Sequence, residues 1–64
     1  MAQSKAVFRE ERDKYFRKAM VALKKGDYMY APIYMDIANK IIGLTKSQVD
    51  SFNQLAWAMR LSRR

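Results

Sequence analysis

Residues 43–49, GLTKSQV, end one helix and begin another. Gly43 is the residue type that most often terminates a helix, because glycine adopts a left-handed backbone conformation without a steric penalty. Thr45 and Gln48 have the spacing of a capping box, in which each side chain accepts a hydrogen bond from the other residue's backbone N–H. The leucine before this pair and the valine after it stand where a hydrophobic staple requires them. The segment therefore predicts a helix that begins at Lys46.

The rest of the chain has two further boundaries of this kind. Ser4 is suited to the N-cap of a first helix, and Gly26 follows two lysines at the position of a left-handed C-cap. Pro32 suits the first turn of a second helix, where its missing N–H costs no hydrogen bond. Apolar residues elsewhere recur at spacings of three and four, so we predict a single all-α domain over residues 1–64. Its three helices are expected at about 4–25, 32–42 and 46–61.

Arg12 interrupts the apolar face of the first predicted helix. Its aliphatic stem can lie over the neighbouring phenylalanine rings while the guanidinium reaches water. The alternatives are a buried ion pair and a contact with a partner. Two other pairs on this helix, Glu10 with Lys14 and Asp13 with Arg17, have the spacing of stabilising ion pairs.

The composition argues against an enzyme. The chain has no cysteine, which excludes disulfides and thiolate metal ligands, and no histidine, the commonest acid–base catalyst. It also lacks a glycine-rich phosphate loop and any cluster of residues with metal-ligand spacing. We therefore predict a non-catalytic protein without a metal or other cofactor.

The net charge of +7 on 64 residues favours an anionic partner, with nucleic acid as the first candidate. Residues 1–25 carry eight basic and three acidic side chains, a net of +5. Residues 26–43 have a net charge of −1, and residues 44–64, with four basic side chains and one acidic, have +3. A basic run on a helix is commonly just a solvated face, so the charge alone does not locate the partner.

The residues LTxxQVxxF at 44–52 resemble the opening of the recognition helix in helix-turn-helix and homeodomain-like proteins. The short connection that contains Gly43 is also of the kind that joins the two helices of that motif. This resemblance implies a helix-turn-helix-like arrangement of the second and third helices and a DNA-binding regulator. The family continues with an aromatic pair, an asparagine and arginines, whereas this chain has NQLA at 53–56.

If the third helix enters a major groove, its outward residues contact DNA. Asp50 lies near the centre of that outward face, where phosphate repels it. The expected phosphate contacts are Lys46, Ser47, Arg60, Arg63 and Arg64, and the expected base contacts are Asn53 and Gln54.

Trp57 and Leu61 form an apolar pair on the outward side of the third predicted helix. Tryptophan is enriched at interface hot spots, and a homodimer would supply the burial that so short a chain lacks. Trp57 has two other interpretations, as a residue of the intrachain core and as a platform for a base. The predicted interface residues are Trp57, Leu61, Tyr28 and Tyr30. They also define the alternative function, a helical adaptor or inhibitor that acts by protein–protein contact.

Residues 28–35, YMYAPIYM, are dense in tyrosine and methionine. They cover the core, form an adaptable binding surface, or stack on unpaired bases. This uncharged stretch is far shorter than the roughly 20 residues that a membrane span needs. A basic membrane-surface helix at the N-terminal end is opposed by its three acidic side chains. The small, helical and basic character also resembles that of temperate-phage accessory proteins, so we expect a cytoplasmic location, in the host if the chain is phage-encoded.

Overall fold

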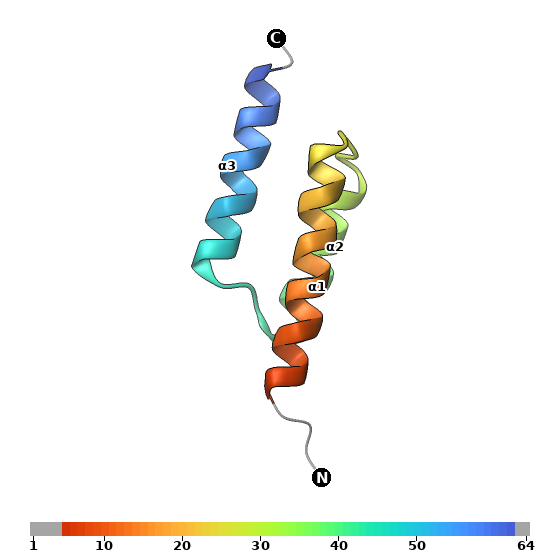
Figure 1. The fold of residues 1–64 in the computed structure, drawn as a ribbon, viewed down its shortest axis with the longest axis vertical. Helices are drawn as coiled ribbons and strands as arrows, with labels where there is room; N and C mark the ends of the chain where they lie inside the picture. Colours follow the sequence, from red (N-terminus) through yellow and green to blue (C-terminus); the bar gives the residue numbers. More distant parts are fainter. Residues whose placement is uncertain (1–4, 63–64) are drawn as a thin grey trace.

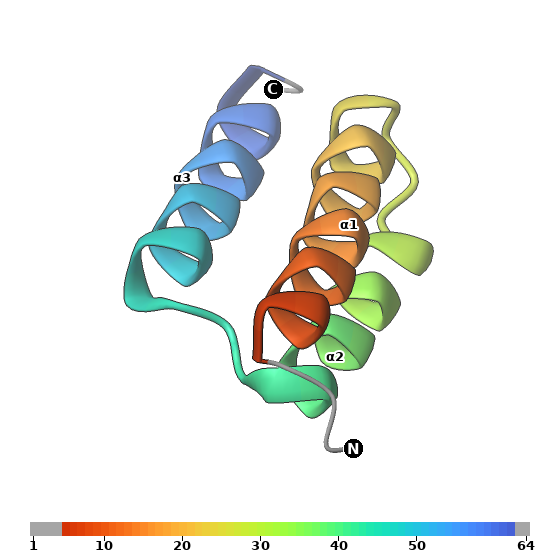
Figure 2. The same cartoon turned by 60° about the horizontal axis from the view of Figure 1, so that its bottom comes forward.

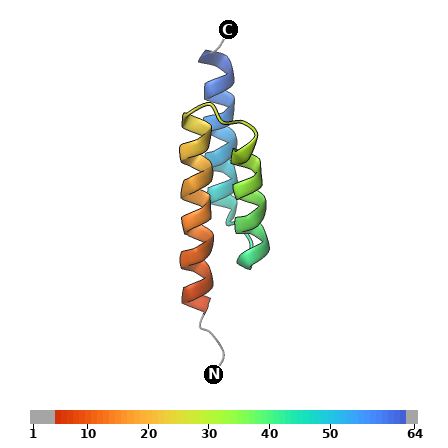
Figure 3. The same ribbon diagram turned by 90° about the vertical axis from the view of Figure 1, so that its right-hand side faces the viewer.

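The computed structural model describes residues 5–62, which form three α-helices. Figure 1 shows α1 (Lys5–Lys24), α2 (Tyr30–Ile42) and α3 (Lys46–Ser62), and the prediction of an all-α three-helix domain is confirmed. The helices run up, down and up along the long axis of the molecule, as Figure 3 shows from the side. The predicted N-cap residue Ser4 lies outside the described residues.

The α1–α2 connection is a Schellman motif centred on Gly26, which has φ +84°. The backbone N–H of Asp27 donates to the Ala22 carbonyl at 2.8 Å, and that of Gly26 donates to the Leu23 carbonyl at 3.1 Å. The Asp27 carboxylate then accepts a hydrogen bond from the Tyr30 N–H at 3.2 Å. Because this hydrogen bond satisfies the N–H of Tyr30 at the start of the helix, α2 begins two residues before the predicted start at position 32.

The α2–α3 connection contains the predicted capping box. The Thr45 N–H donates to Gln48 Oε1 at 3.2 Å, and the Gln48 N–H donates to Thr45 Oγ1 at 3.1 Å. Gly43 has φ +89°, and the next residue, Leu44, donates its N–H to the Asn39 side-chain oxygen at 3.0 Å. The helix therefore starts at the predicted residue, Lys46, because all of its capping partners lie within a few residues of one another.

The buried core consists almost entirely of alanine. The α1–α2 interface contains the fully buried Ala19, Ala31 and Ala38, beside Ala22 and Leu23. Small side chains let the backbones of these two helices approach closely, but each buries little apolar area. The half-buried side chains that pack against this core are Tyr34, Phe52, Leu55 and Ala56.

α1 is the central helix, with α2 on one side and α3 on the other (Figure 2). α3 leans on α1 through side chains that are only half-buried, and none of its described side chains is fully buried. Val49, which sequence periodicity places on the apolar face, is 37% exposed. The third helix is consequently the least embedded element of the fold.

Candidate functional site

Arg12 makes an ion pair, but the pair is partly buried rather than buried as in one of its three predicted alternatives, because the Asp13 side chain is 43% exposed. Its Nε donates to Asp13 Oδ1 at 3.1 Å, its Nη1 donates to the Gly43 carbonyl at 3.2 Å, and its side chain is 13% exposed. Gln48 Nε2 also donates to Asp13 Oδ1, at 2.7 Å. The hydrogen bond from Gln48, together with the charges of Arg12 and Arg17, lowers the pKa of Asp13. This network joins α1 to the start of α3 and has a structural role.

Asp13 pairs with Arg12 and not with Arg17, and several other cations of α1 also have no acidic partner within residues 5–62. The ion pairs within residues 5–62 are Arg12–Asp13 and Lys40–Asp36, the second at 3.2 Å. The expected pairs of Glu10 with Lys14 and of Asp13 with Arg17 are therefore not formed. In consequence, the lysines and the two other arginines of α1 carry charge that no carboxylate of the described chain neutralises by direct contact.

Three of these cations, together with Lys25 just after α1, line one open groove of about 530 Å³ between α1 and α2. The one carboxylate among its described lining residues comes from Asp27, and its aromatic wall comes from Tyr34. We call this site the basic groove. Its lining residues are Lys14, Arg17, Lys18, Val21, Ala22, Lys25, Asp27 and Tyr34.

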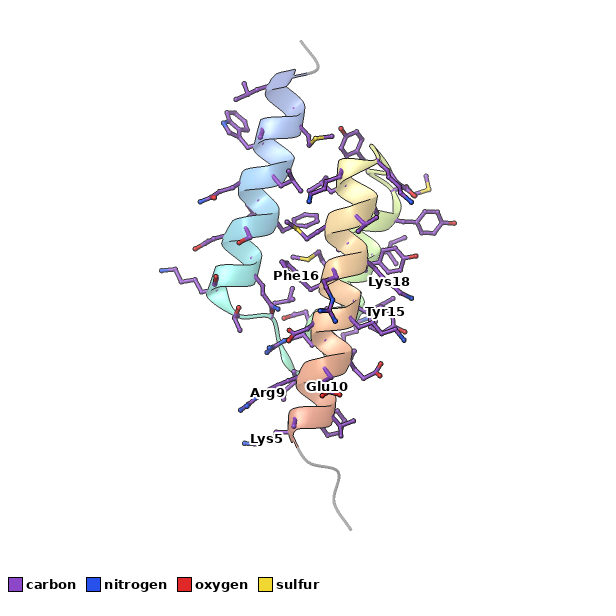
Figure 4. The ribbon with its side chains drawn as sticks, in the orientation of Figure 1. Lys5, Arg9, Glu10, Tyr15, Phe16 and Lys18 are labelled. Atoms are coloured by element: carbon purple, nitrogen blue, oxygen red, sulfur yellow. The ribbon has the colours of Figure 1, made fainter. Side chains whose placement is uncertain are left out.

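A row of three tyrosines lies beside these cations. The rings of Tyr15 and Tyr34 stack with centroids 6.4 Å apart, and those of Tyr34 and Tyr30 are also 6.4 Å apart. The ammonium groups of Lys18 and Lys14 lie 5.3 and 6.0 Å from the Tyr15 centroid, within the range of cation–π attraction. Figure 4 shows Tyr15 and Lys18 on the side of α1 that faces away from α3. Charge and aromatic surface are therefore combined on one face.

The predicted nucleic-acid contacts among the described residues of α3 are all exposed, and they spread over a wide arc of the helix. Asn53 and Arg60 line a second groove of about 530 Å³, which we call the Trp57 groove. Ser47 and Gln54 are exposed and, at 3.6 residues per turn, lie about 100–140° around the helix from Asn53 and Arg60. Lys46 is exposed at the start of α3, about four turns from Arg60. The predicted contacts Arg63 and Arg64 lie outside the described residues.

The predicted interface residues are all exposed, but they belong to two places. Trp57 is 60% exposed and Leu61 48%, so the interpretation of Trp57 as an intrachain core residue is wrong. Tyr28 joins Trp57 in the Trp57 groove, whose full lining is Tyr28, Asn53, Ala56, Trp57 and Arg60. Tyr30, 52% exposed, belongs instead to the tyrosine row. The groove lies where the α1–α2 turn approaches the second half of α3.

Sequence reasoning does not select the basic groove as a site. The signal is present, because Lys14, Lys18 and Lys25 are spaced by four and seven residues and so share a helix face. The sequence does not show the position of Tyr34, which belongs to α2 and forms one wall of the groove. The lysine stripe of α1 becomes a candidate binding site only when a second helix, here α2, packs beside it and forms a wall.

No known protein-family model matches the chain, and comparisons with curated proteins and with solved structures give no significant match. Among the described helices, none combines the length and the apolar character needed to cross a bilayer. Within residues 5–62, no three carboxylates gather into a group that could hold a metal ion.

Proposed function

We propose that this protein is a small non-catalytic nucleic-acid-binding protein. The observation that carries the proposal is the basic groove, in which four cations face one carboxylate and none forms an ion pair with an acidic side chain of residues 5–62. Cations of this kind bind phosphates and release condensed counterions, which gives affinity that falls steeply with salt.

A narrower form of the proposal is a helix-turn-helix regulator that acts as a homodimer, with α3 in the major groove. Its support is the sequence of residues 44–52 and the exposure of Asn53 and Arg60 on one flank of α3. The two helices of that motif usually cross at about 90–120°. Here α2 and α3 run in opposite directions along the long axis of the molecule (Figures 1 and 3), so the arrangement adds no support to the narrower form.

Two double variants with the same change in net charge separate the two binding surfaces. Lys14→Glu with Lys18→Glu alters the basic groove, and Lys46→Glu with Arg60→Glu alters α3. We expect the first pair to weaken binding of a labelled oligonucleotide at least tenfold at low salt, and the second pair to weaken it much less. Fluorescence anisotropy measures the binding, and circular dichroism checks that each variant is folded.

The outcomes distinguish the possibilities directly. A larger loss from the α3 pair would favour the helix-turn-helix form over the basic groove. Equal, small losses from both pairs would show that only net charge matters. Wild-type protein that binds neither single-stranded nor duplex nucleic acid at low salt would overturn the proposal as a whole.

A second candidate function is that of an adaptor or inhibitor that binds another protein or a second copy of the chain. The observation that favours it is the Trp57 groove, where an indole that is 60% exposed lies beside Ala56 and Tyr28. Loss of partner binding or of self-association in Trp57→Ala, with unchanged helicity, would support this function. For either function we propose a cytoplasmic location, in the host if the chain is phage-encoded.

A further inference from the structure

We infer that the nucleic acid bound by the basic groove is single-stranded, and that its unpaired bases stack on the tyrosine row. The inference rests on the proposed nucleic-acid-binding function and names the class of ligand for the same site. Sequence-independent proteins of this kind combine a cationic groove that follows the backbone with aromatic rings that stack on successive bases. Both components are present here on one face of the molecule.

The two components share residues, so one ligand can contact both. Tyr34 lines the basic groove and also holds the middle position of the tyrosine row. Lys14 and Lys18 line the groove and also lie over the Tyr15 ring. A strand whose phosphates contact the lysines therefore has its bases within reach of the rings.

Tyr30 ends the row and is its most accessible ring. It is 52% exposed, whereas Tyr15 and Tyr34 are half-buried between their neighbours. Tyr30, at the first position of α2, donates its backbone N–H to the carboxylate of Asp27, which also lines the groove. The backbone that carries this ring is therefore tied to a residue of the groove.

A duplex would use only half of this surface. Its bases are already stacked inside the helix and cannot lie against a side-chain ring, so only the cations would contribute. The tyrosines therefore favour a single strand.

The test compares a labelled thymidine oligonucleotide with a duplex of the same length at the same salt concentration. We expect the single strand to bind at least tenfold more tightly. Tyr30→Leu should lose about tenfold in single-strand affinity, since stacking on one base is worth about 1–3 kcal/mol. Tyr30→Phe should retain the affinity because it keeps the ring. Tyr28→Leu, which alters a tyrosine of the Trp57 groove, is the matched control and should bind like wild type.

A second measurement needs no variant and so does not depend on the folding of any of them. Oligonucleotides with 5-iodouracil at single positions are photocrosslinked to the wild-type protein, and the attached residue is mapped by mass spectrometry. Crosslinks to Tyr30 or Tyr34 support the inference, and crosslinks confined to α3 overturn it.

The outcomes separate this inference from the proposed function. If duplex binds as tightly as single strand and Tyr30→Leu binds like wild type, the inference is overturned. In that case, loss of binding in Lys14→Glu with Lys18→Glu would still support the proposed function. If the wild-type protein binds neither nucleic acid, both fail.

Discussion

Gln48 Nε2 donates a hydrogen bond of 2.7 Å to Asp13 Oδ1, across 35 positions of sequence. The same side chain accepts the Thr45 N–H through Oε1, so it begins α3 and also fastens that helix to α1. Arg12 adds a bond from α1 to the Gly43 carbonyl. The start of α3 is consequently held by polar contacts, whereas its later turns are held by the half-buried Phe52 and its neighbours.

Gln48→Glu tests the link between the two helices without removing the capping box, in which glutamate is as acceptable as glutamine. The new carboxylate faces Asp13 and replaces a hydrogen bond with a like-charge contact. We expect the free energy of unfolding to fall by about 1–2 kcal/mol at neutral pH. Urea titration followed by circular dichroism measures it. Adding Asp13→Asn should restore part of the loss, because the asparagine amide can donate to the carboxylate introduced at position 48. No loss in the single variant would contradict the assigned role.

The stability that Asp13 contributes should depend on pH in a defined direction. The hydrogen bond from Gln48 and the charge of Arg12 lower the pKa of Asp13 in the folded protein. A lowered pKa gives stability that is present above the unfolded pKa of about 4 and is lost as the pH falls through the folded pKa. The stability difference between wild type and Asp13→Asn should therefore be constant from pH 7 to about pH 5 and shrink at lower pH. A difference that persists unchanged into strong acid would refute the assignment.

Gly43→Ala isolates the backbone cost at the α2–α3 connection. A Cβ at Gly43 would meet no atom within 4 Å, so the expected cost is not a steric clash with a neighbour. The cost comes from φ +89°, which L side chains rarely adopt, and we expect a loss of about 1–2 kcal/mol. Thermal unfolding measures it, with the exposed Ser51→Ala as a control that should stay within about 0.5 kcal/mol. Equal stability of both variants would contradict this prediction, because it would show that the backbone at position 43 changes conformation at little cost.

Leu23→Ala should destabilise the fold much more than Trp57→Ala. Leu23 is 2% exposed and is the largest of the buried core residues, so its truncation should cost about 2–4 kcal/mol and leave so small a domain largely unfolded. Trp57 is 60% exposed, so its truncation should cost less than about 1 kcal/mol. Thermal unfolding compares the stabilities, and sedimentation equilibrium tests whether Trp57→Ala loses any self-association. Unfolding of Trp57→Ala would contradict its exposed position.

The helices can be predicted from sequence because the signals that begin and end them are local. The capping box joins residues three positions apart, and its hydrogen bonds depend only on the conformation of that segment. The predicted start of α2 is two residues late for the same kind of reason. Pro32 is the more conspicuous boundary signal in the sequence, whereas in the structure the Asp27 side chain accepts the Tyr30 N–H and starts the helix earlier.

The candidate site depends on contacts that periodicity does not specify. The lysine stripe of α1 is visible in the sequence, but the alanine-rich face that brings Tyr34 against it acts only when α1 and α2 pack. The exposure of Trp57 likewise follows from the shallow packing of α3 on α1.

The sequence by itself determined three helices, their boundaries to within two residues, and a strongly basic first helix. Only the tertiary structure decided which carboxylate pairs with Arg12, which cations of the described chain remain unpaired, and which rings lie beside them. The physical reason is distance along the chain. Caps and helix periodicity act over about three to five residues, whereas the basic groove and the Gln48–Asp13 bond join segments that meet only through helix packing.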